Sequence, residues 1–270
     1  MPVLTRGDGA LWTSRDPGEA RNRFLKWLFG LVVFFIAFRF IAQETMWEFV
    51  ADAPFQAADF ISRMFPPDFG YTARVLPSLL DTMNLAIFGT FVAVVISVPL
   101  AILAAKNTSP HQLVRLVALA IIVTTRSVTS LIWALLLVQI VGPGLFAGML
   151  AIAVRGIGMI SKLFYEAIEE IDQEPIEAIK STGASTAQVF LYGYVPQLMP
   201  TFVGVTVMRW EINIRESTII GIVGGGGIGF LLNSAINRLR WDQVIVILFT
   251  ILVTVFVAEW ISAKAREAVL

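Results

Sequence analysis

The 270-residue chain contains no cysteine and only one histidine, and 15% of its residues are charged. The absence of cysteine excludes a disulfide framework and thiolate metal ligands. A lone His111 leaves little room for a zinc or haem site, and we expect it to be a solvated loop residue. Lysine plus arginine and aspartate plus glutamate number 20 each, so no basic field favours nucleic acid. We therefore expect no metal, no cofactor and no nucleic-acid partner.

Nucleotide-binding motifs are also scarce. The chain lacks G-x-x-x-x-G-K-[ST], the loop that cradles nucleotide phosphates, so we predict that it has no ATPase site of its own. Gly224, Gly226 and Gly229 match G-x-G-x-x-G, and Asp242 follows further on. That pattern binds dinucleotides only between a strand and a helix. Apolar runs flank it here, so we expect close packing of backbone instead.

Apolar residues are abundant, at 57% of the chain, where a soluble domain is nearer half. Several runs are long enough to cross a bilayer. We predict an all-α membrane protein with about six transmembrane helices. The predicted spans are Phe24–Ala42, Asp81–Ala105, Leu113–Val141, Leu145–Lys162, Gln197 to about Gly221, and Val244–Ser262.

The changes in composition divide the chain into four parts. Residues 1–23 form a polar tail, and residues 24–42 form the first transmembrane helix. Residues 43–77 form an outer loop with an amphipathic pattern that Pro54 interrupts, and this pattern is expected to lie on the membrane surface. Residues 78–270 form the core transmembrane domain.

A polar-rich stretch over residues 166–196 lies between two spans. Its acidic residues are too costly for hydrocarbon, so it is a loop. Pro175 suits a helix N-terminus, and Ser185 suits the cap of a second short helix. Gly183 lies between them and allows a tight turn. The pattern predicts a helix–turn–helix.

The order of Glu177-Ala178, then Gly183, then Val195-Pro196 resembles the "EAA" loop of ABC-importer permeases. In that family the loop is cytoplasmic and docks into a groove on the ATPase subunit. The resemblance implies that Glu177, Ala178, Gly183 and Pro196 couple the chain to an ATPase. The alternative is an ordinary amphipathic connector.

Two further stretches, MFPPDFGYTARVLPSLLDTMNLAIFGT and IRESTIIGIVGGGGIGF, resemble phosphonate-importer permeases, and the second also resembles methionine-type permeases. The resemblance implies a type I ABC-importer permease in a bacterial inner membrane, with a re-entrant connection at the glycine run. It implies alternating access for phosphonate- or phosphate-type anions. The implied partners are an ATPase dimer inside, a solute-binding protein outside, a second permease subunit and membrane lipid.

Two other functions stay open. One is a permease of the same architecture for another solute, such as methionine or an osmoprotectant. The more distant one is a membrane enzyme or a secondary transporter that works without ATP; a secondary transporter should show inverted repeats of hydropathy. We see no such repeats in the sequence.

Lysine and arginine predict the orientation, because they gather on the cytoplasmic side. We assign the tail, residues 106–115, the loop at 166–196 and the C-terminus to one side of the membrane. That side then carries more lysine and arginine residues than the other side. Both termini are then cytoplasmic. The richer side holds Arg6, Arg15, Arg21, Arg23, Lys26, Lys106, Arg115, Lys162, Lys180, Lys264 and Arg266; the other holds Arg63, Arg74, Arg238 and Arg240.

Charged residues within spans usually face a cavity or a partner. On the fifth span Arg209, Asn213 and Glu216 share one face at helical spacing. Glu211 and Arg215 lie nearly opposite, four residues apart with the acid first, which predicts a structural ion pair.

A conduit for an anion needs positive or donor groups at intermediate depth. Arg126, Arg155, Arg209 and Arg215 are the cationic candidates. We favour Arg126, since hydroxyl side chains surround it as in a wetted wall; the alternative is a buried charge satisfied by carbonyls or acids. The predicted pathway residues are Arg126, Ser130, Arg209, Asn213 and Glu216.

Overall fold

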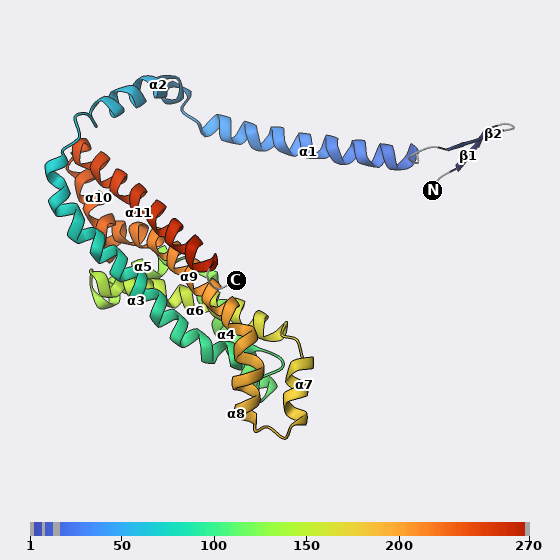
Figure 1. Ribbon diagram of the computed structural model, residues 1–270. Helices are drawn as coiled ribbons and strands as arrows, with labels where there is room; N and C mark the ends of the chain where they lie inside the picture. Colours follow the sequence, from blue (N-terminus) through green and yellow to red (C-terminus); the bar gives the residue numbers. More distant parts are fainter. Residues whose placement is uncertain (1–2, 7–8, 13–16, 268–270) are drawn as a thin grey trace. The chain divides into compact units, whose positions relative to one another are not determined.

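The computed structural model is helical apart from one small hairpin (Figure 1). It consists of two compact units, Met1–Ser62 and Arg63–Leu270. The structure describes residues 3–6, 9–12 and 17–267. Parts of the tail expected over residues 1–23, and the last three residues of the core domain expected over 78–270, lie outside the described residues.

The first unit contains an antiparallel hairpin and two helices. Strand β1 (Val3–Arg6) pairs with β2 (Gly9–Trp12). Helix α1 (Pro17–Glu44) begins at a proline, which suits a first helical turn. Its segment Arg21–Glu44 is long and apolar enough to cross a membrane, and 0% of its most apolar window is buried.

Helix α2 (Trp47–Ser62) is the amphipathic helix of this unit, and none of its residues is buried. The interruption expected at Pro54 does not occur, because the helix continues through that residue. A proline removes one backbone hydrogen bond, and in an exposed helix the freed carbonyl remains open to solvent.

Helices α3 (Thr72–Ala104) and α6 (Leu145–Glu169) form the centre of the second unit; η1 (Phe69–Tyr71) precedes α3. Small residues let them approach closely. A Cβ atom added at Gly156 would lie 2.7 Å from the Cβ of Ala93. The hydroxyl of Ser97 donates to the carbonyl of Ile157 at 3.2 Å.

The third predicted span is broken into α4 (Gln112–Ser127) and α5 (Ser130–Val141), which are bent by 93°. Val128 and Thr129 between them have extended backbone. Local hydroxyl bonds compete with the helix ladder here: Ser127 Oγ donates to the Thr124 carbonyl at 3.0 Å. The span predicted over Leu113–Val141 is therefore a bent pair of helices rather than one straight helix.

A long helical segment, Thr186–Gly225, bends by 57° into α10 (Gly227–Asn237). It contains α8 (Thr186–Val189), the π-helical turn η2 (Phe190–Tyr194), α9 (Val195–Ile220) and a second π-helical turn, η3 (Gly221–Gly225). The backbone already leaves the helical conformation within η3, at Val223 and Gly224, and Gly224, Gly226 and Gly227 make the bend with φ of 99°, 81° and 69°.

The glycine run packs closely against its neighbours, and helices lie on both sides of it rather than a strand. The amide of Ile228 donates to Thr82 Oγ1 at 2.8 Å, and the amide of Gly144 donates to the Gly224 carbonyl at 2.9 Å. Helix α11 (Trp241–Glu267) completes the unit. In the described part of the chain, four helices are apolar and long enough to span a membrane alone, and up to six spans result if each bent pair counts as one.

Candidate functional site

The loop at residues 166–196 forms the predicted helix–turn–helix, and its two arms project from one end of the second unit (Figure 1). The first arm is α7 (Glu174–Ser181), with Pro175 in its first turn as predicted. Ser185 caps the second arm through a reciprocal capping box. The Ser185 amide donates to Gln188 Oε1 at 2.8 Å, and the Gln188 amide donates to Ser185 Oγ at 3.4 Å.

The second arm is not a separate short helix. Helix α8 continues through the π-turn η2 into α9 without a break, so this arm and the following span are one helix. A π-turn inserts one extra residue into a helix, and such turns are frequent at functional sites.

Apolar contacts hold the two arms together. Ile176 of α7 is fully buried, and a Cβ atom added at Gly193 would lie 3.4 Å from Ile176 Cγ1 and 3.5 Å from Ile179 Cδ1. Ile176 and Val189 belong to the same core cluster as Phe164 of α6. The loop is therefore packed onto the bundle as a defined unit.

The predicted coupling residues Glu177, Ala178, Gly183 and Pro196 are all exposed on this unit. Gly183 has φ of 77°, and nothing lies within 4 Å of a Cβ atom built on it. The glycine is thus required by backbone conformation rather than by crowding within the chain.

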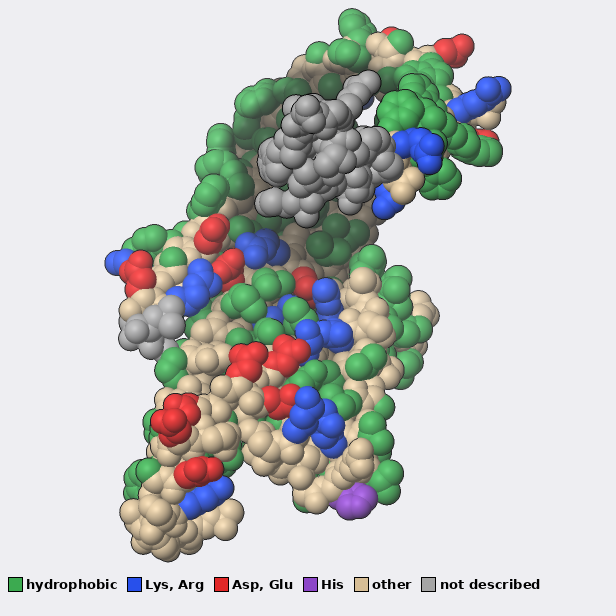
Figure 2. Space-filling model, turned by 90° about the vertical axis from the view of Figure 1, so that its right-hand side faces the viewer, with side chains coloured by type: hydrophobic (Ala, Val, Ile, Leu, Met, Phe, Trp, Pro, Cys, Tyr) green, Lys and Arg blue, Asp and Glu red, His purple; other side chains and the backbone are tan. Residues whose placement is uncertain are grey.

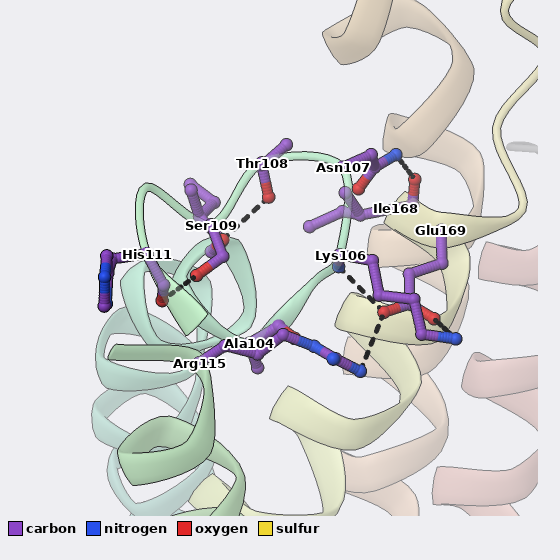
Figure 3. Close-up of polar contacts among 10 residues, drawn as sticks. Ala104, Lys106, Asn107, Thr108, Ser109, His111, Arg115, Ile168 and Glu169 are labelled. Carbon is purple, nitrogen blue, oxygen red and sulfur yellow. Dashed lines mark hydrogen bonds and ion pairs between the residues drawn. The ribbon is translucent and has the colours of Figure 1, made fainter. Parts of the chain in front are cut away.

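Glu169, the last residue of α6, fixes the α3–α4 loop beside the start of this helix–turn–helix (Figure 3). Its Oε1 accepts from the Lys106 amide at 2.8 Å, and its carboxylate lies 3.7 Å from Lys106 Nζ and 4.0 Å from Arg115 Nη2. Asn107 Nδ2 donates to the Ile168 carbonyl at 2.6 Å. Sequence reasoning missed this role of Glu169, because its partners lie far away along the chain.

His111 is exposed, as expected for a loop residue, and it caps α4. Its Nδ1 accepts from the Leu113 amide at 3.1 Å. Among the residues that the structure describes, no group of three or more His, Cys, Asp or Glu side chains is arranged to hold a metal ion.

A second polar group lies inside the bundle and connects α3, α5, α6 and α9. We call it the polar cluster; it comprises Thr90, Ser130, Arg155, Arg209, Asn213 and Glu216. Arg155 Nη1 donates to Glu216 Oε1 at 2.6 Å and to Ser130 Oγ at 3.2 Å. The structure therefore brings three predicted candidates, Ser130, Arg155 and Glu216, into direct contact.

The second half of the polar cluster is more deeply buried. Arg209 Nη2 donates to Asn213 Oδ1 at 3.2 Å, and Asn213 Nδ2 donates to Thr90 Oγ1 at 2.8 Å. Arg209 is 3% exposed and Asn213 is 0% exposed. The predicted shared face of Arg209, Asn213 and Glu216 thus points into the unit. Thr90 had no signal in the sequence beyond being polar within a span.

The predicted pair Glu211–Arg215 is present, with Arg215 Nη2 at 3.0 Å from Glu211 Oε1. Glu211 also lies 3.5 Å from Arg266 Nη1 of α11, a partner that the sequence did not reveal. Arg126 lies in the last turn of α4, next to the 93° bend, and is exposed. Its side chain forms no hydrogen bond or ion pair with another residue in the described part of the chain.

This fold, with a helix–turn–helix projecting between two long apolar helices, is that of a membrane subunit of ABC importers. A chain of the inward-facing MetNI methionine ABC transporter matches with a TM-score of 0.63 at 19% identity, covering 75% of this chain and 99% of that chain. A chain of an amino acid ABC transporter solved with histidines matches with a TM-score of 0.62 at 19% identity, covering 74% and 98%. At such identities the likeness concerns the fold alone.

Residues 97–264 match the family described as binding-protein-dependent transport system inner membrane component, and the chain belongs to this family. The phosphite transport system permease protein PtxC of Stutzerimonas stutzeri is 42% identical over 75% of this chain and 74% of its own length. The phosphate-import permease protein PhnE of Mycolicibacterium smegmatis is 40% identical over 78% of this chain and 40% of its own length.

Proposed function

We propose that the chain is the permease subunit of an ATP-driven importer for phosphorus oxyanions, the class that includes phosphite, phosphonates and phosphate. Two relatives named for phosphite transport are 42% and 38% identical over 75% and 78% of the chain. Two relatives named for methionine transport are 29% and 31% identical over 57% and 45% of it. The difference favours phosphorus oxyanions over methionine, and the family match leaves the secondary-transporter alternative without support.

The observation that carries the proposal is the exposed helix–turn–helix whose second arm continues into α9. A surface with exposed Glu177, Ala178, Gly183 and Pro196 suits docking to a partner ATPase. Because the second arm and the span share one helix, displacement of the docked loop moves the span as well.

The chain works in this proposal as a conduit and a transducer, without hydrolysing ATP itself. Two ATPase subunits dock on the cytoplasmic side, a solute-binding protein docks outside, and a second permease subunit completes the pathway within the lipid. Closure of the ATPases opens the pathway outward, and ATP release returns it inward.

Both termini and the loop at 166–196 are cytoplasmic in this proposal. The contacts of Glu169 place residues 106–115 beside that loop, which supports the shared side expected from the lysine and arginine bias. Figure 2 shows charged side chains on the face in view from the middle of the second unit down to the lobe that carries α7 and α8. Reporter fusions after residue 60 and at the C-terminus test this topology, and a cytoplasmic signal at residue 60 would contradict it.

The test of function is co-expression of the chain with its ATPase and binding protein, followed by uptake into proteoliposomes. We expect copurification of the ATPase and ATP-dependent uptake of phosphite, an alkylphosphonate or phosphate. Uptake of methionine in place of every phosphorus oxyanion would refute the proposed substrate class.

A further inference from the structure

The polar cluster carries an excess of positive charge inside the bundle. Arg155 pairs with the one acid of the cluster, Glu216, at 2.6 Å. Arg209 lies close enough to interact electrostatically with both Glu216 and Arg155. An unbalanced charge within a membrane span is costly, and a structural ion pair alone would need only one arginine. The second arginine therefore indicates that the cluster accommodates a further negative charge at some stage.

The cluster is also incompletely satisfied. Arg209 Nε and Glu216 Oε2 are buried and form no hydrogen bond with a described residue. Arg155 uses Nη1 for both of its bonds, although a guanidinium offers five N–H donors. Buried polar atoms are normally paired, so Arg209 Nε and the remaining N–H groups of Arg155 are available to a ligand, and Glu216 Oε2 is an acceptor without a partner among the described residues.

The cluster opens to the surface of this chain at Arg155. The Arg155 side chain is 32% exposed and that of Glu216 is 12% exposed, whereas Arg209 is 3% exposed. Ser130 begins α5, and the N-cap residue Thr129 makes no side-chain hydrogen bond to that helix. The amides of Ile132 and Trp133 donate to the Thr129 carbonyl at 3.1 and 3.2 Å, so only the Ser130 and Leu131 amides at the start of α5 can be offered to an anion, and Ser130 lies next to the exposed guanidinium.

We propose that Arg155, Ser130 and Arg209 form a transit site for a tetrahedral phosphorus oxyanion, and that Glu216 occupies this site when no solute is present. A guanidinium binds carboxylate and phosphate oxygens in the same geometry, so the Glu216 carboxylate stands where a solute oxygen would bind. Release of the Arg155–Glu216 bond frees the guanidinium for the passing anion. Competition from Glu216 keeps the binding weak, as conduction requires.

This inference rests on the proposed function, and the experiment separates the two. The complete transporter with its ATPase and binding protein is reconstituted, and uptake of phosphite, methylphosphonate and phosphate is measured. We expect Arg155→Gln to reduce uptake by about ten- to a hundredfold, the range for losing a hydrogen bond to a charged group. Arg155→Lys should recover part of the loss, because the charge remains.

Lys162→Gln is the matched control. It removes a cation from the same helix, and that cation pairs with Glu166 at 3.2 Å outside the cluster, so uptake should stay unchanged. If the wild type imports a phosphorus oxyanion and Arg155→Gln imports it equally well, the transit site is wrong and the proposed function stands. If the wild type imports none of the three anions, the proposed function fails first.

A binding measurement gives the readout that a merely structural role would not move. Titration of inorganic phosphate into the purified complex without binding protein, followed by ³¹P NMR, should show binding tightened about tenfold by Glu216→Gln and abolished when Arg155→Gln is added. Equal phosphate affinity in the wild type, in Glu216→Gln and in the double variant with Arg155→Gln would overturn the proposal. Glu216→Gln can impair assembly, so the yield of assembled complex is measured for every variant by size-exclusion chromatography. If Glu216→Gln does not assemble, the comparison of phosphate affinity between Arg155→Lys and Arg155→Gln tests the proposal instead.

Discussion

The loop at 166–196 and the polar cluster are opposite solutions to carrying polar groups in an apolar protein. The loop exposes its polar residues and is held by buried apolar contacts around Ile176. The cluster buries Arg209 and Asn213 and is held by hydrogen bonds across four helices. A surface of the first kind suits a protein partner, and an interior of the second kind suits a hydrated solute. Helices α6 and α9 both extend from one region to the other.

The largest effect is expected at the turn of the loop. Gly183→Leu should leave insertion largely intact and abolish transport, because an L residue at this positive φ costs about 1–2 kcal/mol and distorts the docking surface. Binding-protein stimulation of ATPase activity is the measurement. Gly183→Asn should retain more activity, since asparagine tolerates this conformation. Near-normal stimulation with Gly183→Leu would be fatal to the coupling role.

Next is the apolar support of the loop. Ile176→Ala should destabilise the packing of α7 by about 2–5 kcal/mol, the usual cost of truncating a buried isoleucine. Hydrogen exchange should then increase over residues 174–194, and ATPase stimulation should fall. Ile176→Val is the milder control. Unchanged exchange in Ile176→Ala would show that the loop does not depend on this contact.

The third prediction separates pathway from structure among the remaining arginines. Arg126→Gln should reduce uptake severalfold while the complex assembles, because Arg126 is exposed and has no partner to lose among the described residues. Arg215→Gln should lower the yield of folded protein only modestly, since Arg266 still lies near Glu211. Uptake and assembly yield are measured side by side, and the reverse pattern would exchange the two roles.

The smallest effect is expected at Glu169. Glu169→Gln keeps an acceptor for the Lys106 amide but removes two partly exposed ion pairs, which are worth less than about 1 kcal/mol. ATPase stimulation should fall slightly at low salt and match the wild type at high salt, where such pairs are screened. Glu166→Gln serves as control. A large loss at high salt would mean that Glu169 acts by something other than these pairs.

The features predicted correctly from the sequence are the local ones. Pro175, the Ser185 cap and the Glu211–Arg215 pair each depend on residues within four positions, where helix geometry alone decides the contact. Arg155 and Glu216 are 61 positions apart, and Lys106 and Glu169 are 63 apart. Such contacts depend on the register between helices, which small residues such as Gly156 set by packing.

The bend between α4 and α5 could also have been predicted differently. The hydroxyl residues around Arg126 were interpreted as a wetted wall, although the same residues favour a break in a helix. The continuity of α8 with α9 was missed because Ser185 carries a cap and Pro196 suits a helix start, while a π-turn has no comparable sequence signal.

The continuity of α8 with α9 determines how far the loop lies from the polar cluster along one helical segment. From Ser185 to Glu216 the helical segment is roughly 46 Å long at 1.5 Å per residue, so the loop and the acid of the polar cluster lie near opposite ends of one helical segment, which includes the π-turn η2 and Pro200. The bond between Arg155 and Glu216 is 2.6 Å long, and hydrogen bonds are lost beyond about 3.5 Å. A sliding of α9 against α6 by about 1 Å would therefore weaken this hydrogen bond while the two charges stay within ion-pair distance, so in the coupling that we propose a movement of the loop adjusts the contact between Arg155 and Glu216.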